Sequence, residues 1–468
     1  MNLPCALSVR LLALGIYLHC GLLIGQPSES PYSYKNDWTS LRQHQSPQWL
    51  LDAKFGIYCH WGIQTLQYIP EYADLSDDER IALFKGDHFD ADQWAEVFER
   101  AGAKFGGVIG WHGSDFKHWD SQYSDYTSAK MGPKIDIVGE VSKAVKKRGL
   151  KFLVSYHSIK GDDWLPYAKE GVDKYDPDIF WVDASFGGTK GGHHRKTLAY
   201  SKFIGMNEKS HKAFAEKYQR EFITYFYNNA LQKGKEVEFM YKSHDIPPGV
   251  GMRDLENGIL PRTPYDTWIT DMDMSVPPDW ETHGWFYREG IPLRSANELV
   301  DMLVDVVSKN GIFLLNIPPK ADGTFPEEVV ETLATVGDWL DKNGEAIYQT
   351  SPWFLYGQGP AEIPEGNYIF HHNNHFAQIA YTRADIRFTV KGNNLYATCL
   401  GKPESSFSIE ALNSSFKVHE GDIVRISHLG SGKEITFEHT PKALILNLEG
   451  LPLDDKANAF KIELDFGL

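Results

Sequence analysis

The stretch Phe55-Gly-Ile-Tyr-Cys-His60 decides the fold, because it opens a series of short apolar runs that alternate with helix-forming segments. The runs span residues 55–60, 105–112, 152–157, 179–183, 237–242, 252–256, 267–271 and 312–316. Apolar strands separated by helices are typical of a parallel sheet. About eight of them over roughly 300 residues predict an α/β fold of the (β/α)8 barrel type. A doubly wound open sheet is the alternative, but the Gly-rich first turn of that fold is missing.

Segments with a helical period lie between these runs. They cover residues 90–103, 137–148, 295–310 and the stretch after Pro326. Each places apolar side chains on one helical face. The third opens with Ser295 and Glu298, which have the spacing of a capping box, and it stops before Gly311.

The composition changes near residue 350, where helical periodicity ends. Short alternating strands follow at residues 386–390, 394–398, 423–426 and 443–446, a pattern typical of a β-sandwich. Tyr356-Gly-Gln-Gly-Pro360 indicates a linker. We therefore expect a (β/α)8-like barrel over residues 31–350 and a β-sandwich domain over residues 352–468. We expect the sandwich to support the barrel rather than to bind glycans, because a fold does not specify a function.

Residues 1–25 have the pattern of a signal peptide, with Arg10, an apolar run and then the polar stretch Gln26-Pro-Ser28. The run is shorter than a membrane span needs, so we expect no span. Cleavage would leave Cys59 and Cys399, which are far apart in sequence, so no disulfide framework is expected. These features predict a secreted or periplasmic protein, or a lysosomal one in a eukaryotic cell.

The overall charge excludes several classes of partner. The formal net charge is −16, which repels nucleic acid and anionic lipid headgroups. The chain carries no P-loop or dinucleotide fingerprint, so no nucleotide cofactor is expected. Aromatic residues make up 13% of the chain, which suits the binding of sugar rings as well as a large barrel core. The sequence leaves the oligomeric state open.

Chemically active residues follow several of the apolar runs, and barrel active sites lie at the carboxyl ends of the strands. These residues are His60, Trp61, His112, His157, Trp181, Asp183, Lys242 and Glu256. Asp183 precedes the loop-like stretch Ala184-Ser-Phe-Gly-Gly188, which favours contact with a ligand over a helix cap. Glu256 is the candidate partner carboxylate. Two carboxylates across a glycosidic bond can divide the roles of nucleophile and general acid/base.

A series of motifs stands in a fixed order along the chain. Among them are Ala53-Lys-Phe-Gly-Ile-Tyr-Cys-His-Trp-Gly62, residues 101–105, 131–140 and 147–152, Tyr175-Asp-Pro-Asp-Ile-Phe-Trp-Val-Asp183, and residues 307–311, 314–317 and 343–348. In sequence and order they resemble the retaining α-L-fucosidases, glycoside hydrolase family 29. The resemblance spans about residue 31 to the C-terminus.

The resemblance implies hydrolysis of terminal α-L-fucose from oligosaccharides or glycoconjugates, with retention, and without a metal or another cofactor. Asp183 would be the nucleophile that forms a fucosyl intermediate, and Glu256 would act first as acid and then as base. The substrate-binding set implied in this way, together with the strand-end residues, is His60, Trp61, Glu71, His112, His157, Trp181, Lys242 and Trp285. Phe286 is an alternative to Trp285 for contact with the methyl group of the sugar.

Two departures from the family pattern keep other functions open. Gly113 stands where the family usually carries a second His, so one hydroxyl contact is missing or is supplied by His118 or Asp115. Residues 187–206 are rich in Gly, His and Lys, but their His193-His194 pair has no third ligand at metal-site spacing. The alternatives are a non-catalytic fucose-binding homologue and a glycosidase for a related sugar, either an α-L-galactoside or a sulfated fucose.

Overall fold

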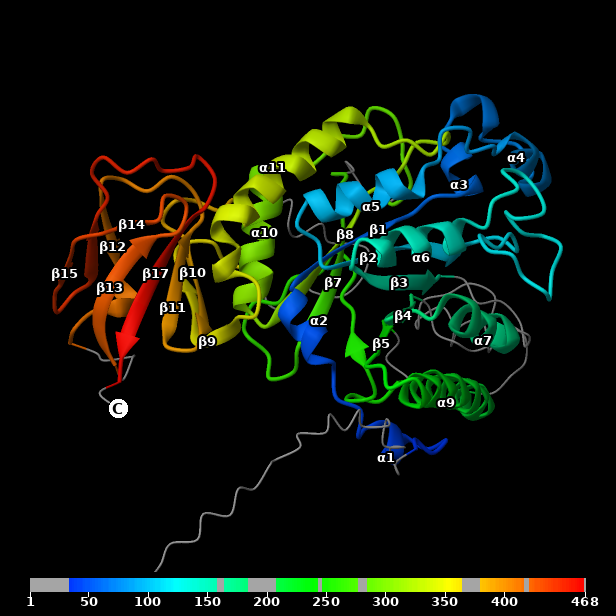
Figure 1. Cartoon of the computed structure of the whole chain (residues 1–468), viewed down its shortest axis with the longest axis horizontal. Coiled ribbons are helices and arrows are strands. Elements are labelled where there is room, and N and C mark those ends of the chain that lie inside the picture. The colour runs from blue at the N-terminus through cyan, green and yellow to red at the C-terminus, as the bar shows by residue number, and fades with distance from the viewer. Residues whose placement is uncertain are drawn as a thin grey trace, which may run out of the picture.

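The structure is a computed structural model that describes residues 33–157, 164–183, 208–242, 246–276, 284–363, 379–415 and 421–466. It places an eight-stranded parallel sheet beside two smaller antiparallel sheets (Figure 1). This arrangement confirms the predicted fold class, an α/β barrel followed by β-sheets at the C-terminus.

The parallel sheet forms the barrel. Its strands are β1 Phe55–Cys59, β2 Phe105–Trp111, β3 Lys151–Tyr156, β4 Ile179–Val182, β5 Glu238–Tyr241, β6 Met252–Arg253, β7 Trp268–Asp273 and β8 Gly311–Asn316. The order is β6-β5-β4-β3-β2-β1-β8-β7, and a parallel bridge between Asp254 and Ile269 joins the two ends. The sheet therefore closes, which excludes the doubly wound alternative, and every predicted apolar run overlaps one of its strands.

Helices cover the outside of the barrel (Figure 1). The longer ones are α5 Ala91–Arg100, α6 Ile137–Lys147, α7 Trp164–Tyr175, α9 Glu208–Gln232, α10 Ala296–Ser308 and α11 Glu327–Asn343. Shorter helices are α1 Trp38–Leu41, α2 Gln48–Ala53, α3 Ile63–Leu66 and α4 Asp77–Leu83. The four predicted helical segments correspond to α5, α6, α10 and α11, and the predicted capping box of Ser295 and Glu298 is present at the start of α10.

The C-terminal strands form a six-stranded sheet and a three-stranded sheet. In sheet order, the first contains β14 Lys433–Glu434, β13 Asp422–His428, β17 Asn458–Asp465, β11 Asn394–Cys399, β10 Ile386–Lys391 and β9 Ser351–Gln358. The second contains β12 Ser406–Ile409, β16 Leu444–Asn447 and β15 Phe437–His439. The predicted domain boundaries stay predictions.

The linker predicted at Tyr356-Gly-Gln-Gly-Pro360 is wrong, because Tyr356, Gly357 and Gln358 belong to β9, which pairs with β10. A Cβ atom at Gly357 would lie 2.4 Å from the carbonyl oxygen of Ile386. The glycine therefore serves close strand packing rather than a turn.

Two apolar layers surround the barrel strands, because successive side chains of a strand point to opposite faces. Ile57 and Cys59 of β1 belong to the core between strands and helices, while Tyr58 points inward. The interior cluster also contains Phe105, Leu153, Trp181, Met240, Ile269 and Leu314. This packed interior forms the floor on which a site at the strand ends can rest.

A buried ionic cluster joins the barrel to the C-terminal sheets. Arg387 of β10 donates through Nε to Asp305 of α10, and Lys309 Nζ lies 2.7 Å from the other carboxylate oxygen of Asp305. All three side chains are buried. Helix α10 packs on β9 and β10 over the same area (Figure 1).

Replacing Arg387 by Met is expected to lower the free energy of unfolding by about 1–3 kcal/mol, because Asp305 loses one of its two buried cationic partners. Urea unfolding monitored by fluorescence measures the change. Arg425→Met is the matched control, since its ion pair with Glu463 lies at the surface and contributes little to stability. Equal losses in the two variants would contradict a structural role for the cluster.

Among the described residues, no helix is both long enough and apolar enough to span a membrane. The predicted signal peptide over residues 1–25 lies outside the described part of the chain and stays a prediction.

Candidate active site

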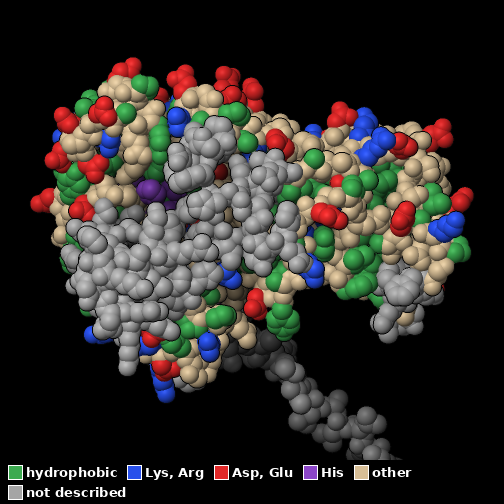
Figure 2. Space-filling view, turned by 180° about the vertical axis from the view of Figure 1, so that it is seen from behind, with side chains coloured by type: hydrophobic (Ala, Val, Ile, Leu, Met, Phe, Trp, Pro, Cys, Tyr) green, Lys and Arg blue, Asp and Glu red, His purple; other side chains and the backbone are tan. Residues whose placement is uncertain are grey.

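Five polar residues each stand directly after a barrel strand. His60 follows β1, His112 follows β2, His157 follows β3, Asp183 follows β4 and Lys242 follows β5. Because the strands are parallel, these side chains emerge at one end of the barrel. Figure 2 shows a small patch of histidine, in purple, in a hollow of one face of the molecule.

Asp183 lies at the centre of this end of the barrel. Its Oδ1 is 2.5 Å from Nζ of Lys242, and its Oδ2 is 3.4 Å from Nδ1 of His157. The side chain is 14% exposed. The carboxylate is thus held from two sides and still reaches the open side of the site.

Lys242 connects Asp183 to Glu256. Its Nζ lies 2.5 Å from Oδ1 of Asp183 and 3.1 Å from Oε2 of Glu256. These two oxygens therefore lie no farther apart than the sum of the two distances. The geometry brings the predicted catalytic carboxylates together on one ammonium group.

Asp254 and Asp271 complete the surroundings of Lys242, and they were not among the predicted site residues. Their nearest oxygens lie 3.6 and 3.1 Å from Nζ of Lys242. Burial raises the pKa of Asp271 to about 6 and that of Asp254 well above its usual range. Burial alone would lower the pKa of Lys242, but the carboxylates, Asp183 foremost, hold it well above its usual value.

Replacing Lys242 by Met is expected to lower the free energy of unfolding by about 3 kcal/mol at pH 8, because the four carboxylates lose their shared cation. The pKa values of Asp254 and Asp271, which burial already raises, would rise further above those of the unfolded chain. A carboxyl group whose pKa is raised by folding reduces stability as the pH rises, so the loss should be smaller at pH 5.

Urea unfolding at pH 5 and at pH 8 measures the effect. Lys402→Met is the control, since Lys402 forms an exposed ion pair with Asp455. A loss for Lys242→Met that does not change between the two pH values would contradict the electrostatic explanation.

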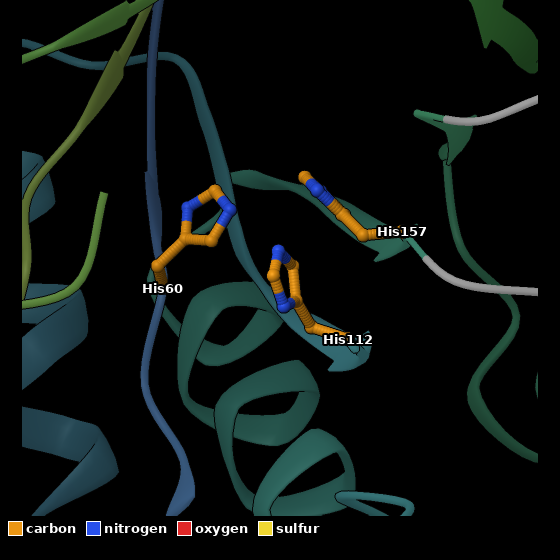
Figure 3. Close-up of side chains that lie close together, drawn as sticks. All are labelled: His60, His112 and His157. Carbon is orange, nitrogen blue, oxygen red and sulfur yellow. The ribbon is translucent and has the colours of Figure 1, made fainter. Parts of the chain in front are cut away.

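Three histidines face one another beside Asp183 (Figure 3). The ring centroids of His60, His112 and His157 lie 4.7–5.4 Å apart. Burial lowers the pKa of His112 to about 4, that of His157 to about 3, and that of His60 well below its usual value. The three rings are therefore neutral at physiological pH and offer both donors and acceptors for hydrogen bonds.

Aromatic side chains form the walls of the site. The ring of Trp285 lies 5.3 Å from that of His60, and the ring of Phe286 lies 5.0 Å from that of His112. Trp181 packs edge-on to His157 from inside the barrel, and Lys242 Nζ lies 5.1 Å from the centre of its ring. The indole Nε1 of Trp181 is buried and has no hydrogen-bond partner among the described residues.

Trp61 and Glu71 are not brought to this group by any contact among the described residues. Trp61 is fully buried in the outer core, and its indole N–H donates to the carbonyl of Lys320 at 2.8 Å. Glu71 is exposed on the short 3-10 helix Pro70–Tyr72. The expected sugar contact of Trp61 is not supported by this placement, because the side chain after His60 points away from the barrel interior. The role of Glu71 stays a prediction.

The loop around Gly113 has room for a further side chain. A Cβ atom there would meet only Nε2 of Gln64, at 3.7 Å, although the φ angle of +66° favours glycine. His118 does not fill the gap, since its ring is buried, holds the carbonyl of Ile109 at 3.0 Å and packs on Gly62. Asp115 is exposed. Residues 187–206, with His193 and His194, lie outside the described part of the chain.

Comparisons with known proteins identify the family of this chain. The α-L-fucosidase family model matches residues 22–80 and 70–345. Tissue α-L-fucosidase of Rattus norvegicus is 25% identical over 482 residues and covers 90% of both chains. Plasma α-L-fucosidase of Homo sapiens is 28% identical over 381 residues, which are 70% of this chain and 74% of that protein.

A solved structure is also similar. Thermotoga maritima α-fucosidase in complex with fucose has a TM-score of 0.69 and 27% identity, and the match covers 92% of this chain and all of that one. The family match spans most of the barrel, and the structural match extends into the C-terminal sheets. The chain therefore belongs to the α-L-fucosidase family of glycoside hydrolases.

Proposed function

We propose that this protein hydrolyses terminal α-L-fucose from glycans with retention of configuration, with Asp183 as nucleophile and Glu256 as general acid/base. The observation that carries the proposal is the position of both carboxylates on one ammonium group, at the end of the barrel where such active sites lie. Retaining glycosidases hold their two carboxyl groups about 5–5.5 Å apart, whereas inverting enzymes leave about 6.5–9.5 Å. The two short distances to Lys242 favour the first class.

The reaction has two steps: Glu256 donates a proton in the first and accepts one in the second. In the first, an oxygen of Asp183 forms a bond to the anomeric carbon while Glu256 gives a proton to the departing glycosidic oxygen. In the second, Glu256 removes a proton from water, the water oxygen bonds to the anomeric carbon, and the bond to Asp183 breaks. Two inversions give the sugar its original configuration.

The walls of the site suit a deoxy sugar. His60, His112 and His157 are neutral and can each hold a hydroxyl group, and the unpartnered indole N–H of Trp181 adds a donor. Trp285 and Phe286 offer apolar rings to the methyl group at C6. The similarity to a fucosidase structure in complex with fucose supports the choice of sugar.

In this mechanism, Lys242 orients the nucleophile Asp183 and stabilises its negative charge. Its charge keeps Asp183 ionised and in one orientation before attack. Because Asp254 and Asp271 also contact Lys242, the ammonium group keeps ionic partners when Asp183 becomes an ester. The four carboxylates therefore allow the cation to stay in place throughout the cycle.

Hydrolysis of aryl glycosides by the purified protein tests the function. We expect turnover of an aryl α-L-fucoside and little turnover of the matching α-L-galactoside and β-D-galactoside. Preference for the α-L-galactoside would assign a related sugar. Binding of L-fucose by calorimetry without turnover of any substrate would assign a non-catalytic fucose-binding protein instead.

A further inference from the structure

The three histidines beside Asp183 form a converging set of nitrogen donors. One ring nitrogen from each of His60, His112 and His157 lies within 4.8 Å of the other two. The rings come from the ends of three neighbouring strands, β1, β2 and β3, and point toward one another (Figure 3). Binding of sugar hydroxyl groups does not by itself require the three ring nitrogens to lie so close to one another.

The hydrogen bonds of the three histidines show which ring nitrogens keep a free lone pair. Nδ1 of His60 lies 2.9 Å from Oδ1 of Asn316, an acceptor, so Nδ1 carries the hydrogen and Nε2 keeps its lone pair. Nδ1 of His157 faces the carboxylate of Asp183 in the same way. Nε2 of His157 and Nδ1 of His112 are buried without a hydrogen-bond partner among the described residues.

We propose that His60, His112 and His157 bind a divalent transition-metal ion of the zinc type, and that this ion competes with the sugar for the site. Imidazole donors suit Zn²⁺, Cu²⁺ and Ni²⁺, whereas Mg²⁺ and Ca²⁺ prefer oxygen. Three histidines with an open fourth position are an established zinc-binding arrangement. The competition rests on the proposed function, but the binding of the ion does not.

The surroundings of the rings favour an ion. Metal-bound histidines usually donate their other N–H to an amide or carboxylate oxygen, as His60 does to Asn316 and His157 does to Asp183. The carboxylate of Asp183 also supplies nearby negative charge. Zn–N bonds of about 2.0–2.1 Å would draw the nitrogens inward from a separation that is already at most 4.8 Å.

The ion and the sugar would need the same ring nitrogens. Nε2 of His157 and Nδ1 of His112 are buried without a hydrogen-bond partner among the described residues, so their lone pairs face either ligand. An ion held there occupies the same lone pairs that the sugar hydroxyls need. Zinc should therefore raise the KM for an aryl α-L-fucoside and leave kcat unchanged.

Calorimetric titration of the chelator-treated, full-length protein with Zn²⁺ tests the site. We expect one ion per chain, and we expect His157→Phe, which keeps an aromatic ring but removes the nitrogens, to weaken its binding by roughly 100-fold. His439→Phe, in β15 of the C-terminal sheets, is the matched control. A second control, the His193→Asn and His194→Asn double variant, tests the pair outside the described residues. Both controls should bind Zn²⁺ like the wild type.

X-ray absorption at the zinc edge adds a structural readout, with three nitrogen neighbours expected at about 2.0–2.1 Å. No binding by the wild type, or binding that survives His157→Phe and disappears in the double variant, would overturn the proposal. Zinc binding by a protein that hydrolyses no fucoside would leave the metal site standing and refute the proposed function. Fucoside hydrolysis without zinc binding would support the proposed function and refute the metal site.

Discussion

Replacement of Asp183 by Gly should lower kcat for an aryl α-L-fucoside by at least about 10⁴-fold, because the covalent step loses its nucleophile. Lys242 and His157 hold the carboxylate from two sides, and its side chain remains 14% exposed. Sodium azide should restore turnover, since the small anion fits the space left by the carboxylate. The product should be β-L-fucosyl azide, with inverted configuration.

Asp271→Asn is the matched control for this variant. It removes another carboxylate from Lys242 but lies inside strand β7, below the point of attack. We expect a much smaller loss of kcat and no rescue by azide. Circular dichroism of both variants checks that they fold. Full activity of a folded Asp183→Gly protein would remove Asp183 from the mechanism.

Replacement of Glu256 by Ala should lower the hydrolysis of a fucosyl disaccharide by about 10²–10⁴-fold, the usual contribution of a general acid. An aryl fucoside with a good leaving group should lose much less in the first step, because its oxygen departs without a proton. Azide should again accelerate turnover. Here it attacks the fucosyl intermediate, so the product should be α-L-fucosyl azide, the opposite anomer from the Asp183 variant.

Product configuration, read by proton NMR, separates the two roles. The same azide anomer from both variants would contradict the assignment of nucleophile and acid/base. Equal losses on the disaccharide and on the activated aryl fucoside would show that Glu256 does not protonate the leaving group. Asp254→Asn is a suitable control, because Asp254 contacts the same lysine but lies two residues earlier in the chain.

The strand pattern predicted much of the barrel and of the site. Each apolar run begins or ends where the spacing of apolar residues along the chain changes. The polar residue at the end of a run can therefore be located to within one residue, as with His112, His157 and Lys242. The position of parallel strands in a barrel then brings these ends together. Identification of the sugar came from the family resemblance instead.

The alternation of side chains along a strand explains what was misplaced. His60 and Trp61 are adjacent, so only one of them can face the interior, and the sequence does not say which. Asp254 and Asp271 were missed for another reason. Their pairing arises where β6 meets β7 as the barrel closes, with the backbone N–H of Asp271 donating to Asp254 at 3.1 Å.

Helix α7 shows how tertiary packing overrides local propensity. Gly171, in the interior of the helix, disfavours a helix in isolation. A Cβ atom at position 171 would lie 2.5 Å from the hydroxyl oxygen of Tyr156, so glycine allows the helix to approach β3. Close packing also explains the wrong prediction at Gly357. This glycine indicated a linker, but it permits β9 and β10 to pack closely.

The stereochemistry of hydrolysis tests the proposed mechanism most directly. Proton NMR spectra should be recorded as the wild-type protein cleaves an aryl α-L-fucoside, before mutarotation mixes the anomers. Two displacements through Asp183 predict α-L-fucose as the first product, followed by slow appearance of the β anomer. Initial release of β-L-fucose would mean a single displacement by water, and it would contradict the roles proposed for Asp183 and Glu256.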